Sequence, residues 1–567
     1  MNLRRRDFLR LGAMAGAGCL LFPKNYVFGQ NSPKLTPFVD PLPIPPVLSG
    51  AASFDIHMRQ FFQKLHRDLP PTKLWGYEGM FLGPTFEVRS GSPITVQWLN
   101  DLPGQKHFLP AVDTTIHGSE SNVPEVRSVV HLHGAKVLAD SDGYPEAWFT
   151  NGFGKTGPFF STRVYHYPND QAATMLWYHD HSLGITRLNV FAGLAGVYLI
   201  RDEDEDELPL PKGKFEIPLV FMDRAFNADG SLHYPVQTVP PPPPPVSPIW
   251  VPEFFGDTAL VNGKILPFLE VEPRKYRFRM LNACNARFLH LTLTNSTDNT
   301  DQLHFHQIGT DQGFLHKPVT LMDLLMSPAE RFDVVIDFTG QKGKSFILNN
   351  DAPAPFPGGG APGMVPQFME VRVTLPLTST DQPLPERLAP VHLLETEDAV
   401  RVRRLTLREN DDPNGNPIID FLGDRRWNEP ITENPRAGTI EQWDLINTTT
   451  DGHPIHVHLV RFNVINRQLF DLNVFNQTGK LKFLGPPEPP APNERPAWKD
   501  TVVVFPGDTT SGQGKLTRII AKFDLPNEAE FPPGNRQQYV WHCHILEHED
   551  NEMMRPYAVV SGKEDKD

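Results

Sequence analysis

Apolar residues along the chain occur in short runs separated by turn-forming residues. Runs rich in Val, Thr, Phe and Leu are broken repeatedly by proline and glycine, of which the sequence has 58 and 42. Short apolar runs between turn residues are typical of β-strands. The sequence has no long amphipathic helical pattern, and no internal apolar run is long enough to span a bilayer. The pattern therefore predicts an all-β protein with many turns.

Two junctions divide the predicted strands into blocks. The acidic run Asp202–Glu207 follows an apolar strand and is interpreted as a solvated linker. A second junction, rich in Pro, Thr and Ser, lies around residues 375–390. We expect three domains, each close in size to an elaborated Greek-key sandwich, at about residues 30–205, 206–380 and 381–567.

The first 29 residues have the features of an export signal. Arg4, Arg5 and Arg6 precede an apolar run from about Leu11 to Phe22, as in twin-arginine signals. We expect cleavage near Gly29, with lipidation at Cys19 as the alternative. The chain is therefore expected to reach the periplasm or the extracellular space.

The charge balance restricts the partners. Without residues 1–29 the chain has 48 Lys and Arg against 66 Asp and Glu. Such an acidic balance argues against nucleic acids and anionic membranes as partners. We expect a monomer that acts on a small molecule.

The most informative motif is His542-Cys543-His544, followed by His548 and Met553. Successive side chains of a strand point to opposite faces, so the cysteine and its two flanking histidines face different sites. A thiolate, an imidazole and a weak axial thioether are ligands of a blue-copper centre, and Cys543, His548 and Met553 supply them. The flanking histidines would face a second site that binds through nitrogen.

Three further histidine motifs have the matching spacing. In His453-Pro454-Ile455-His456-Val457-His458 the first histidine faces away from the other two on an extended strand. His453 can thus complete the blue-copper site. The remaining histidines of these motifs, His131, His133, His179, His181, His456 and His458, join His542 and His544 in a cluster of eight. Eight nitrogens suit three copper ions with open positions for dioxygen. The cluster requires the first and third domains to abut, and the middle domain is expected to be structural.

Other residues receive less specific interpretations. His304 and His306 have the same spacing, but their context favours a structural role. Met554 and Cys284 are interpreted as core residues, and His166 as a hydrogen-bonding core histidine. With Cys543 assigned to copper, no disulfide is expected. The proline run at residues 240–245 predicts a stiff surface excursion, and the Gly/Pro-rich residues 352–366 a flexible surface loop that borders a substrate entrance.

The chain resembles the multicopper oxidases. The sequences HLHG, WYHDH, HPIHVHL and HCHILEHEDNEMM occur in the order of that family, and DSDGYPEAWF, LVNGKILPFLEVEPRKYRFR and AWKDTV extend the likeness over nearly all of the mature chain. More narrowly, it is similar to bacterial spore-coat laccases with bilirubin oxidase activity. The resemblance implies three cupredoxin-like domains and four copper ions: one type 1, one type 2 and two type 3.

The resemblance also implies a role for each ligand. His453, Cys543 and His548, with Met553 axial, would bind the type 1 ion. His131 and His456 would bind the type 2 ion. The two type 3 ions would be bound by His133, His179 and His544, and by His181, His458 and His542. Asp142 and Glu549 would relay protons, although Asp142 could instead only cap a turn.

The implied reaction couples four one-electron oxidations to the reduction of dioxygen to two waters, with electrons passing from Cys543 to the flanking histidines. Phenols, aromatic amines and tetrapyrroles are the expected donors. Oxidation of cuprous or manganous ions is an alternative, and copper sequestration without catalysis is a second one. A copper nitrite reductase is set aside, because it would not need the paired histidine motifs.

Overall fold

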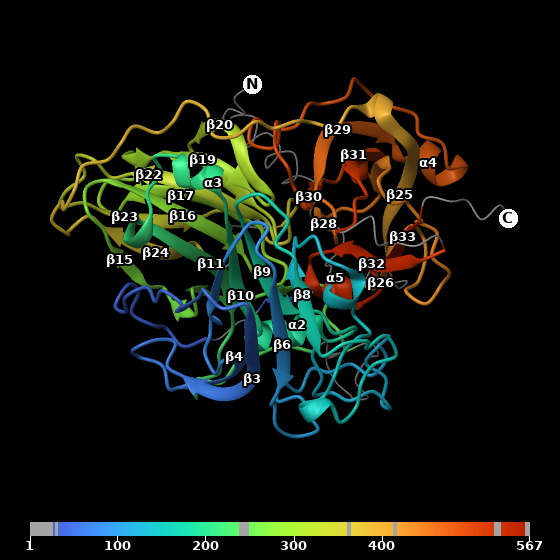
Figure 1. The fold of residues 1–567 in the computed structure, drawn as a ribbon, viewed down its shortest axis with the longest axis horizontal. Helices are drawn as coiled ribbons and strands as arrows, with labels where there is room; N and C mark the ends of the chain where they lie inside the picture. The colour runs from blue at the N-terminus through green and yellow to red at the C-terminus, as the bar shows by residue number, and fades with distance from the viewer. Residues whose placement is uncertain are drawn as a thin grey trace.

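The computed structural model describes residues 27–28, 32–236, 249–359, 365–411, 417–526 and 534–561. Within these residues strands predominate and helices are short, which confirms the all-β prediction. Figure 1 shows three lobes that follow one another along the chain, blue to cyan, green to yellow, and orange to red. The proline run at residues 240–245 and the export signal, apart from Val27–Phe28, lie outside the described residues.

The first sandwich is built from nine strands. They are β2 Val47–Leu48, β3 Ser53–Gln63, β4 Thr72–Tyr77, β5 Thr85–Arg89, β6 Ile94–Asn100, β7 Val130–His133, β8 Val164–Tyr167, β9 Thr174–Asp180 and β10 Ala195–Arg201. The sheet orders are β4-β3-β6-β8 and β2-β5-β10-β9-β7. Alternate residues of β6 are buried, as the two-residue period of a strand requires. Trp98 of one sheet packs against Phe86 and Tyr178 of the other, with ring centroids 6.2 and 5.3 Å away.

The middle sandwich follows directly. Its strands are β11 Glu216–Arg224, β13 Thr258–Val261, β14 Lys264–Ile265, β15 Phe268–Glu270, β16 Lys275–Asn282, β17 Leu289–Asn295, β18 Gln302–Leu303, β19 Phe305–Thr310, β20 Gly313–Leu321, β21 Leu324–Met326, β22 Arg331–Asp337, β23 Ser345–Asn350 and β24 Gln367–Arg372. One sheet has the order β14-β13-β11-β16-β22-β19-β20, and the other β15-β24-β23-β17-β18 with β21 beside β17. Cys284 lies in the core between these sheets, so its interpretation as a buried apolar residue is confirmed.

The third sandwich contains β25 Ala399–Asp411, β26 Pro417–Leu422, β27 Ile440–Asn447, β28 His453–Val457, β29 Phe462–Asp471, β30 Thr501–Val504, β31 Gln513–Lys522, β32 Arg536–Cys543 and β33 Met554–Val560. Its sheet orders are β26-β25-β27-β31-β29 and β30-β28-β32-β33. Trp443 and Trp541 pack across the two sheets, with ring centroids 5.6 Å apart. A two-stranded pair joins β1 Val27–Phe28 to β12 Phe254–Phe255.

The acidic run after the first sandwich differs from the predicted solvated linker. It forms the short helix α3, Glu203–Glu207, and the Asp202 side chain caps the helix by accepting from the Glu205 amide. Glu205 is buried and pairs with Arg277 and Arg279 of β16. The prediction was wrong for Glu205 because a strand distant in the sequence supplies the guanidinium groups that compensate its burial.

The segment predicted to be a flexible surface loop also differs in its first half. Ala352, Ala354 and Phe356 are buried and belong to the same apolar cluster as Cys543. Phe356 stacks on Phe288 with ring centroids 4.4 Å apart. Apolar contacts with two sandwiches therefore hold a segment whose composition alone favours a loop in solvent.

Three further short helices are α2 Thr186–Ala192, α4 Leu472–Thr478 and α5 Leu546–Asp550. None of the described helices has the length and apolar character that a membrane crossing requires. Asp550 of α5 accepts from the backbone amides of Thr186 and Arg187 in α2, which ties the first sandwich to the third.

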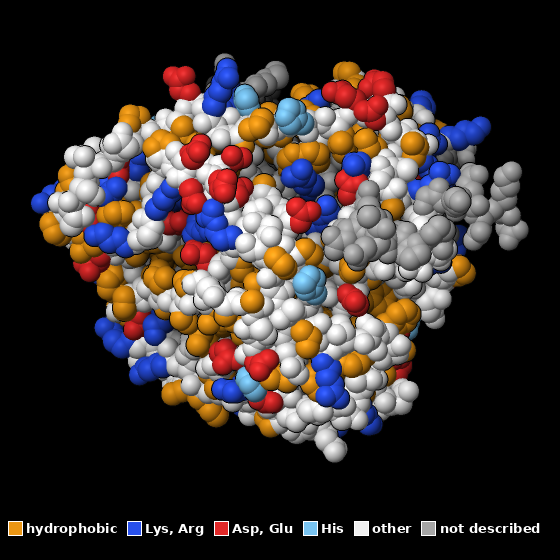
Figure 2. All heavy atoms as spheres, in the orientation of Figure 1, with side chains coloured by type: hydrophobic (Ala, Val, Ile, Leu, Met, Phe, Trp, Pro, Cys, Tyr) orange, Lys and Arg blue, Asp and Glu red, His pale blue; other side chains and the backbone are white. Residues whose placement is uncertain are grey.

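Over the face drawn in Figure 2, acidic and basic side chains lie interspersed.

Candidate metal centre

The antiparallel pairing of β28 with β32 sets the site. In this ladder Ile455 lies opposite Cys543 and His456 lies opposite His542. Cys543 Sγ is 3.6 Å from His453 Nδ1 and 3.9 Å from His548 Nδ1. These three buried residues form one possible metal-binding group, which we call the thiol group. The structure thus brings Cys543 together with the two histidines predicted for it.

The eight remaining histidines are brought together between the first and third sandwiches. The ladder of β7 with β9 places His131 opposite His179 and His133 opposite Trp177. Ligand atoms within 4.8 Å of one another define three all-histidine groups: His131, His456 and His458; His133, His179 and His544; and His181, His458 and His542. All eight residues, called here the histidine cluster, are buried. The last two groups have the same members as the two trios expected from the family resemblance.

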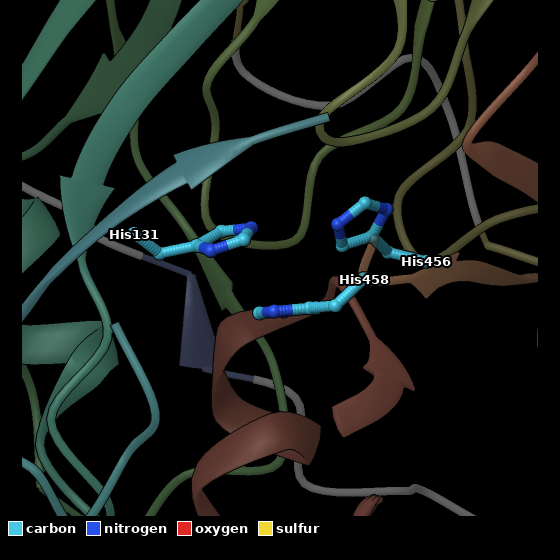
Figure 3. A group of neighbouring side chains, drawn as sticks. All are labelled: His131, His456 and His458. Atoms are coloured by element: carbon cyan, nitrogen blue, oxygen red, sulfur yellow. The ribbon is translucent and has the colours of Figure 1, made fainter. Parts of the chain in front are cut away.

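Figure 3 shows how the two sandwiches meet. His131 extends from the first sandwich, and His456 and His458 approach it from the third. The rings of His131 and His458 are nearly parallel, with centroids 3.7 Å apart and planes 21° apart. The rings of His133 and His456 stack in the same way at 3.6 Å.

The nitrogen atoms of the cluster fit a metal. Nδ1 of His131, His179 and His456 lies 2.6, 2.8 and 2.8 Å from the backbone carbonyl oxygens of Asp142, Asp180 and Asp500. The Nε2 atom of each of these rings is buried and has no hydrogen-bond partner among the described residues. Unpaired buried nitrogens are costly, and a metal ion would satisfy them.

In the third group the nitrogens converge on one another. His542 Nε2 lies 3.3 Å from His181 Nε2 and 3.2 Å from His458 Nε2. Burial lowers the pKa of His181 and His458 well below the ordinary value, and that of His179 and His456 to about 3. Neutral imidazoles that face one another in this way present lone pairs, which is the form in which histidine binds metals.

The thiol group has a different chemistry. Burial raises the pKa of the Cys543 thiol well above its usual value, so a bound cation is needed to hold it as a thiolate. Met553 is fully buried in the apolar cluster of Cys543, and the Cys543 amide donates to its carbonyl at 3.0 Å. Met554 packs in a separate cluster with Val540 and Trp427. Of the two methionines, Met553 therefore lies on the side of the thiol.

Two buried acids border the histidine cluster. Asp142 Oδ2 lies 2.7 Å from His458 Nδ1. Glu549 of α5 lies between two rings, with Oε2 3.1 Å from His542 Nδ1 and Oε1 3.6 Å from His181 Nδ1. Both predicted acids are thus within reach of cluster histidines.

Some residues near the site were missed by sequence reasoning. Asp500 contacts His133, and Arg331 of β22 contacts Asp500. Glu409 Oε1 lies 3.6 Å from His453 Nε2, and Glu253 Oε1 lies 4.0 Å from His548 Nε2. Asp500 belongs to the AWKDTV sequence, and this was the only signal that placed it near the site. Arg331, Glu409 and Glu253 occur in stretches with no motif.

Two predicted histidine assignments can be compared with the structure. Among the described residues, His304 and His306 belong to none of the possible metal-binding groups. His166 is exposed on β8, so its assignment to the core was wrong. Side chains of β8 alternate between two faces: His166 lies on the face exposed to solvent, whereas its neighbours Tyr165 and Tyr167 face the core.

Comparison with known proteins agrees with this geometry. Two family models, both described as multicopper oxidase, match residues 113–205 and 402–563. The chain is 46% identical over 535 residues to a laccase of Bacillus subtilis (strain 168), covering 93% of this chain and 99% of that protein. A laccase of Bacillus stratosphericus is also 46% identical, over 541 residues, with 93% and 99% covered.

A solved structure has the same architecture. The McoA multicopper oxidase of the hyperthermophile Aquifex aeolicus superposes with a TM-score of 0.71 at 26% identity, covering 92% of this chain and 99% of that one. This likeness and the identity to the laccases confirm the expected cupredoxin-like sandwiches and the family resemblance. The chain belongs to the multicopper oxidase family and is a copper-dependent oxidoreductase that uses oxygen as its electron acceptor.

Proposed function

We propose that the protein is a laccase-type oxidase that couples four one-electron oxidations of phenolic, aromatic amine or tetrapyrrole donors to the reduction of dioxygen to two waters. The observation that carries the proposal is the end of β32. Cys543 belongs to the thiol group, while His542 and His544 belong to two groups of the histidine cluster. One short piece of backbone therefore links an electron-accepting site to a site for dioxygen.

We propose the following ligands for four copper ions. The thiol group, together with Met553, would hold the type 1 ion. His131 and His456 would hold the type 2 ion, and the two type 3 ions would be held by the trio of His133, His179 and His544 and by the trio of His181, His458 and His542. Copper bound in these groups would supply the one-electron redox chemistry and the reduction of dioxygen.

The protein's own residues orient the donors and exclude water. Backbone carbonyls fix the outward nitrogens of His131, His179 and His456, so their other nitrogens face the cluster without reorganisation. All eight rings are buried between two sandwiches. A buried, oriented set of donors keeps reactive oxygen species away from solvent.

Asp142 and Glu549 are proposed to move protons to the site. Burial raises the pKa of Asp142 well above its usual value, which favours the protonated form of its carboxyl. Asp142 is the C-cap residue of the short 3-10 turn Ala139–Ser141, and its Oδ1 atom has no hydrogen-bond partner among the described residues. The Asp142 carboxyl faces His458 instead, which supports the relay over the turn-capping alternative.

Oxidation of a metal ion is a second candidate function. Glu253 is buried and Glu409 is partly buried, and the two lie near the two histidines of the thiol group. Carboxylate oxygens favour manganous ions, whereas cuprous ions prefer softer donors. If this candidate holds, E253Q should raise the KM for manganous ion and leave the KM for a phenol unchanged.

An oxygen electrode provides the test of the main proposal. Protein reconstituted with cupric ion should consume one dioxygen per four electrons taken from a phenol, an aromatic amine or bilirubin, with little peroxide released. Release of peroxide in amounts equal to the oxygen consumed would contradict it. Copper binding without oxygen uptake would indicate sequestration instead.

We also propose export through the twin-arginine signal, a monomeric state, and domain limits near residues 205 and 380. The Arg4-Arg5-Arg6 sequence supports the first of these proposals. The irregular backbone of residues 377–395 between β24 and β25 supports the second domain limit. Fractionation of cells that produce the R5K/R6K variant would test export, and light scattering would test the monomeric state.

A further inference from the structure

Asp500 lies between the histidine cluster and the middle sandwich. Its Oδ1 atom is 3.1 Å from His133 Nε2 and accepts from the Thr501 hydroxyl at 2.9 Å. Arg331 donates through Nη1 to the same oxygen at 2.7 Å and through Nη2 to Oδ2. Gln312 Nε2 donates to Oδ2 at 2.6 Å. Both carboxylate oxygens are therefore held by the middle sandwich.

The guanidinium group of Arg331 is itself held on several sides. Its Nε atom donates to the Met175 carbonyl at 3.1 Å, and Nη2 donates to the Asp311 carbonyl at 2.9 Å. Its backbone amide donates to Asp311 Oδ1 at 2.9 Å. Arg331 is also buried, with 1% of its surface exposed. A planar fork fixed in this way restricts the carboxylate to one orientation.

We propose that Arg331, from the sandwich that contributes none of the proposed copper ligands, is a positioning residue that orients His133 for copper through Asp500. The inference rests on the proposed function, in which His133 binds a type 3 ion. Asp500 accepts a hydrogen bond from the N–H group at His133 Nε2, and the lone pair of the neutral ring is then on Nδ1. Nδ1 is the buried nitrogen of this ring that has no hydrogen-bond partner among the described residues.

His133 needs a positioning contact of this kind more than the neighbouring histidines of the cluster do. The outward nitrogens of His131, His179 and His456 lie against backbone carbonyls, whose direction the strands already fix. The outward nitrogen of His133 meets side-chain oxygens, from Asp500 and Thr501. A side chain can rotate, so a further contact is needed to hold it.

Asp500 could be considered a ligand itself, because it lies with His133 and His456 in a possible metal-binding group. The contacts argue against this role. Arg331 occupies both carboxylate oxygens, and a guanidinium group there repels a second cation. The Asp500 side chain also faces the outward side of His133, away from its unpaired nitrogen.

The glycine of the HLHG sequence supports the same network. Gly134 has φ +88°, and a Cβ added there would lie 2.5 Å from Asp500 Oδ2 and 2.8 Å from both Arg331 Nη2 and Gln312 Nε2. Real Cβ atoms essentially never approach other atoms so closely. The backbone beside His133 is therefore packed directly against the carboxylate and the two side chains that hold it.

The test is resistance of the copper-loaded enzyme to a chelator. R331Q should lose cluster copper at a chelator concentration about 10- to 100-fold lower than wild type, the usual cost of removing a residue that orients a ligand. R331K, which keeps the charge but not the fork, should fall between the two. The visible thiolate absorption should be unchanged in both, because Arg331 does not contact the thiol group.

R277Q is the matched control. Arg277 of β16 is also buried and donates to the carboxylate of Asp333 in β22, through Nε at 2.9 Å and through Nη2 at 2.6 Å. R277Q should lower the melting temperature without changing copper retention. Equal copper loss in R277Q and R331Q, or wild-type retention in R331Q and R331K, would overturn the inference.

H133A separates this inference from the proposed function. If H133A loses cluster copper while R331Q, R331K and D500N retain it, only the positioning role is wrong. If H133A itself retains all copper, the proposed ligand set is wrong, and the inference falls with it. D500N should reproduce the loss seen in R331Q, because its amide lacks the second oxygen that accepts from Arg331 Nη2 and Gln312.

Discussion

Cys543 Sγ lies 3.6 Å from His453 Nδ1, although 90 positions separate the two residues. The ladder between β28 and β32 creates this contact, and Cys543 is the only cysteine in a possible metal-binding group of the described residues. C543S should therefore lose the visible thiolate absorption and the oxidation of phenols. Absorption spectroscopy and copper analysis of the purified variant would measure this.

The control for this substitution is C284S. Cys284 is also buried, but it lies in the core of the middle sandwich. C284S should cost about 1–2 kcal/mol of folding stability, since it buries a hydroxyl, and leave the absorption unchanged. A C543S enzyme that still shows the visible band would refute the proposed thiolate ligand.

Replacement of Glu549 tests the first proton relay. E549L removes the carboxylate beside His181 and His542 but none of the proposed ligands. Turnover should fall by about 10²- to 10⁴-fold, the range of general acid catalysis, while copper content stays near wild type. Single-turnover reoxidation by dioxygen should slow by a similar factor. Unchanged turnover across the pH range would reject the role.

Asp142 calls for a pair of variants. D142N keeps an oxygen near His458 but cannot carry a proton, so turnover should fall and copper retention should change little. D142A removes the contact, so copper should also be lost at about 10- to 100-fold lower chelator concentration. If both variants lower only the melting temperature, Asp142 is merely a turn residue.

His290 gives a pH dependence of stability that is unrelated to copper. Burial alone would lower the pKa of His290, but hydrogen bonds and charge from Asp323 and Asp351 outweigh it and raise the pKa to about 9. Because the folded value exceeds the unfolded one, the contribution is complete below about pH 6.5 and is lost as the pH rises toward 9.

H290N should remove this dependence. Both aspartates are more than half exposed, so screening limits the effect to about 1 kcal/mol. Urea unfolding at pH 6 and pH 9.5 should show a smaller difference for the variant than for wild type. An equal difference in the two proteins would show that other groups cause the dependence.

The sequence predicted the strands well, and it indicated which of the proposed ligands share a strand face, for a physical reason. Strand side chains alternate with a period of two, so the spacing of His131 with His133, or of Cys543 with its neighbours, already specifies which residues share a site. The opposition of His131 to His179 in the β7–β9 ladder could not be read in this way, since it depends on strand pairing.

What the sequence did not predict involves partners that are distant along the chain. Glu205 is buried because Arg277 and Arg279 surround it, and Phe356 is buried because Phe288 stacks on it. The contact of Arg331 with Asp500 spans 169 positions and follows no local pattern. Short-range spacing contains no information about such pairs.

The histidine cluster also constrains the order of events during synthesis. Its members come from the first and third sandwiches, and His181 and His542 are 361 positions apart. A nascent chain that has emerged only as far as the middle sandwich has four of these eight rings and no member of the thiol group. Metal capture at this centre therefore has to wait until the third sandwich has been made and has docked against the first.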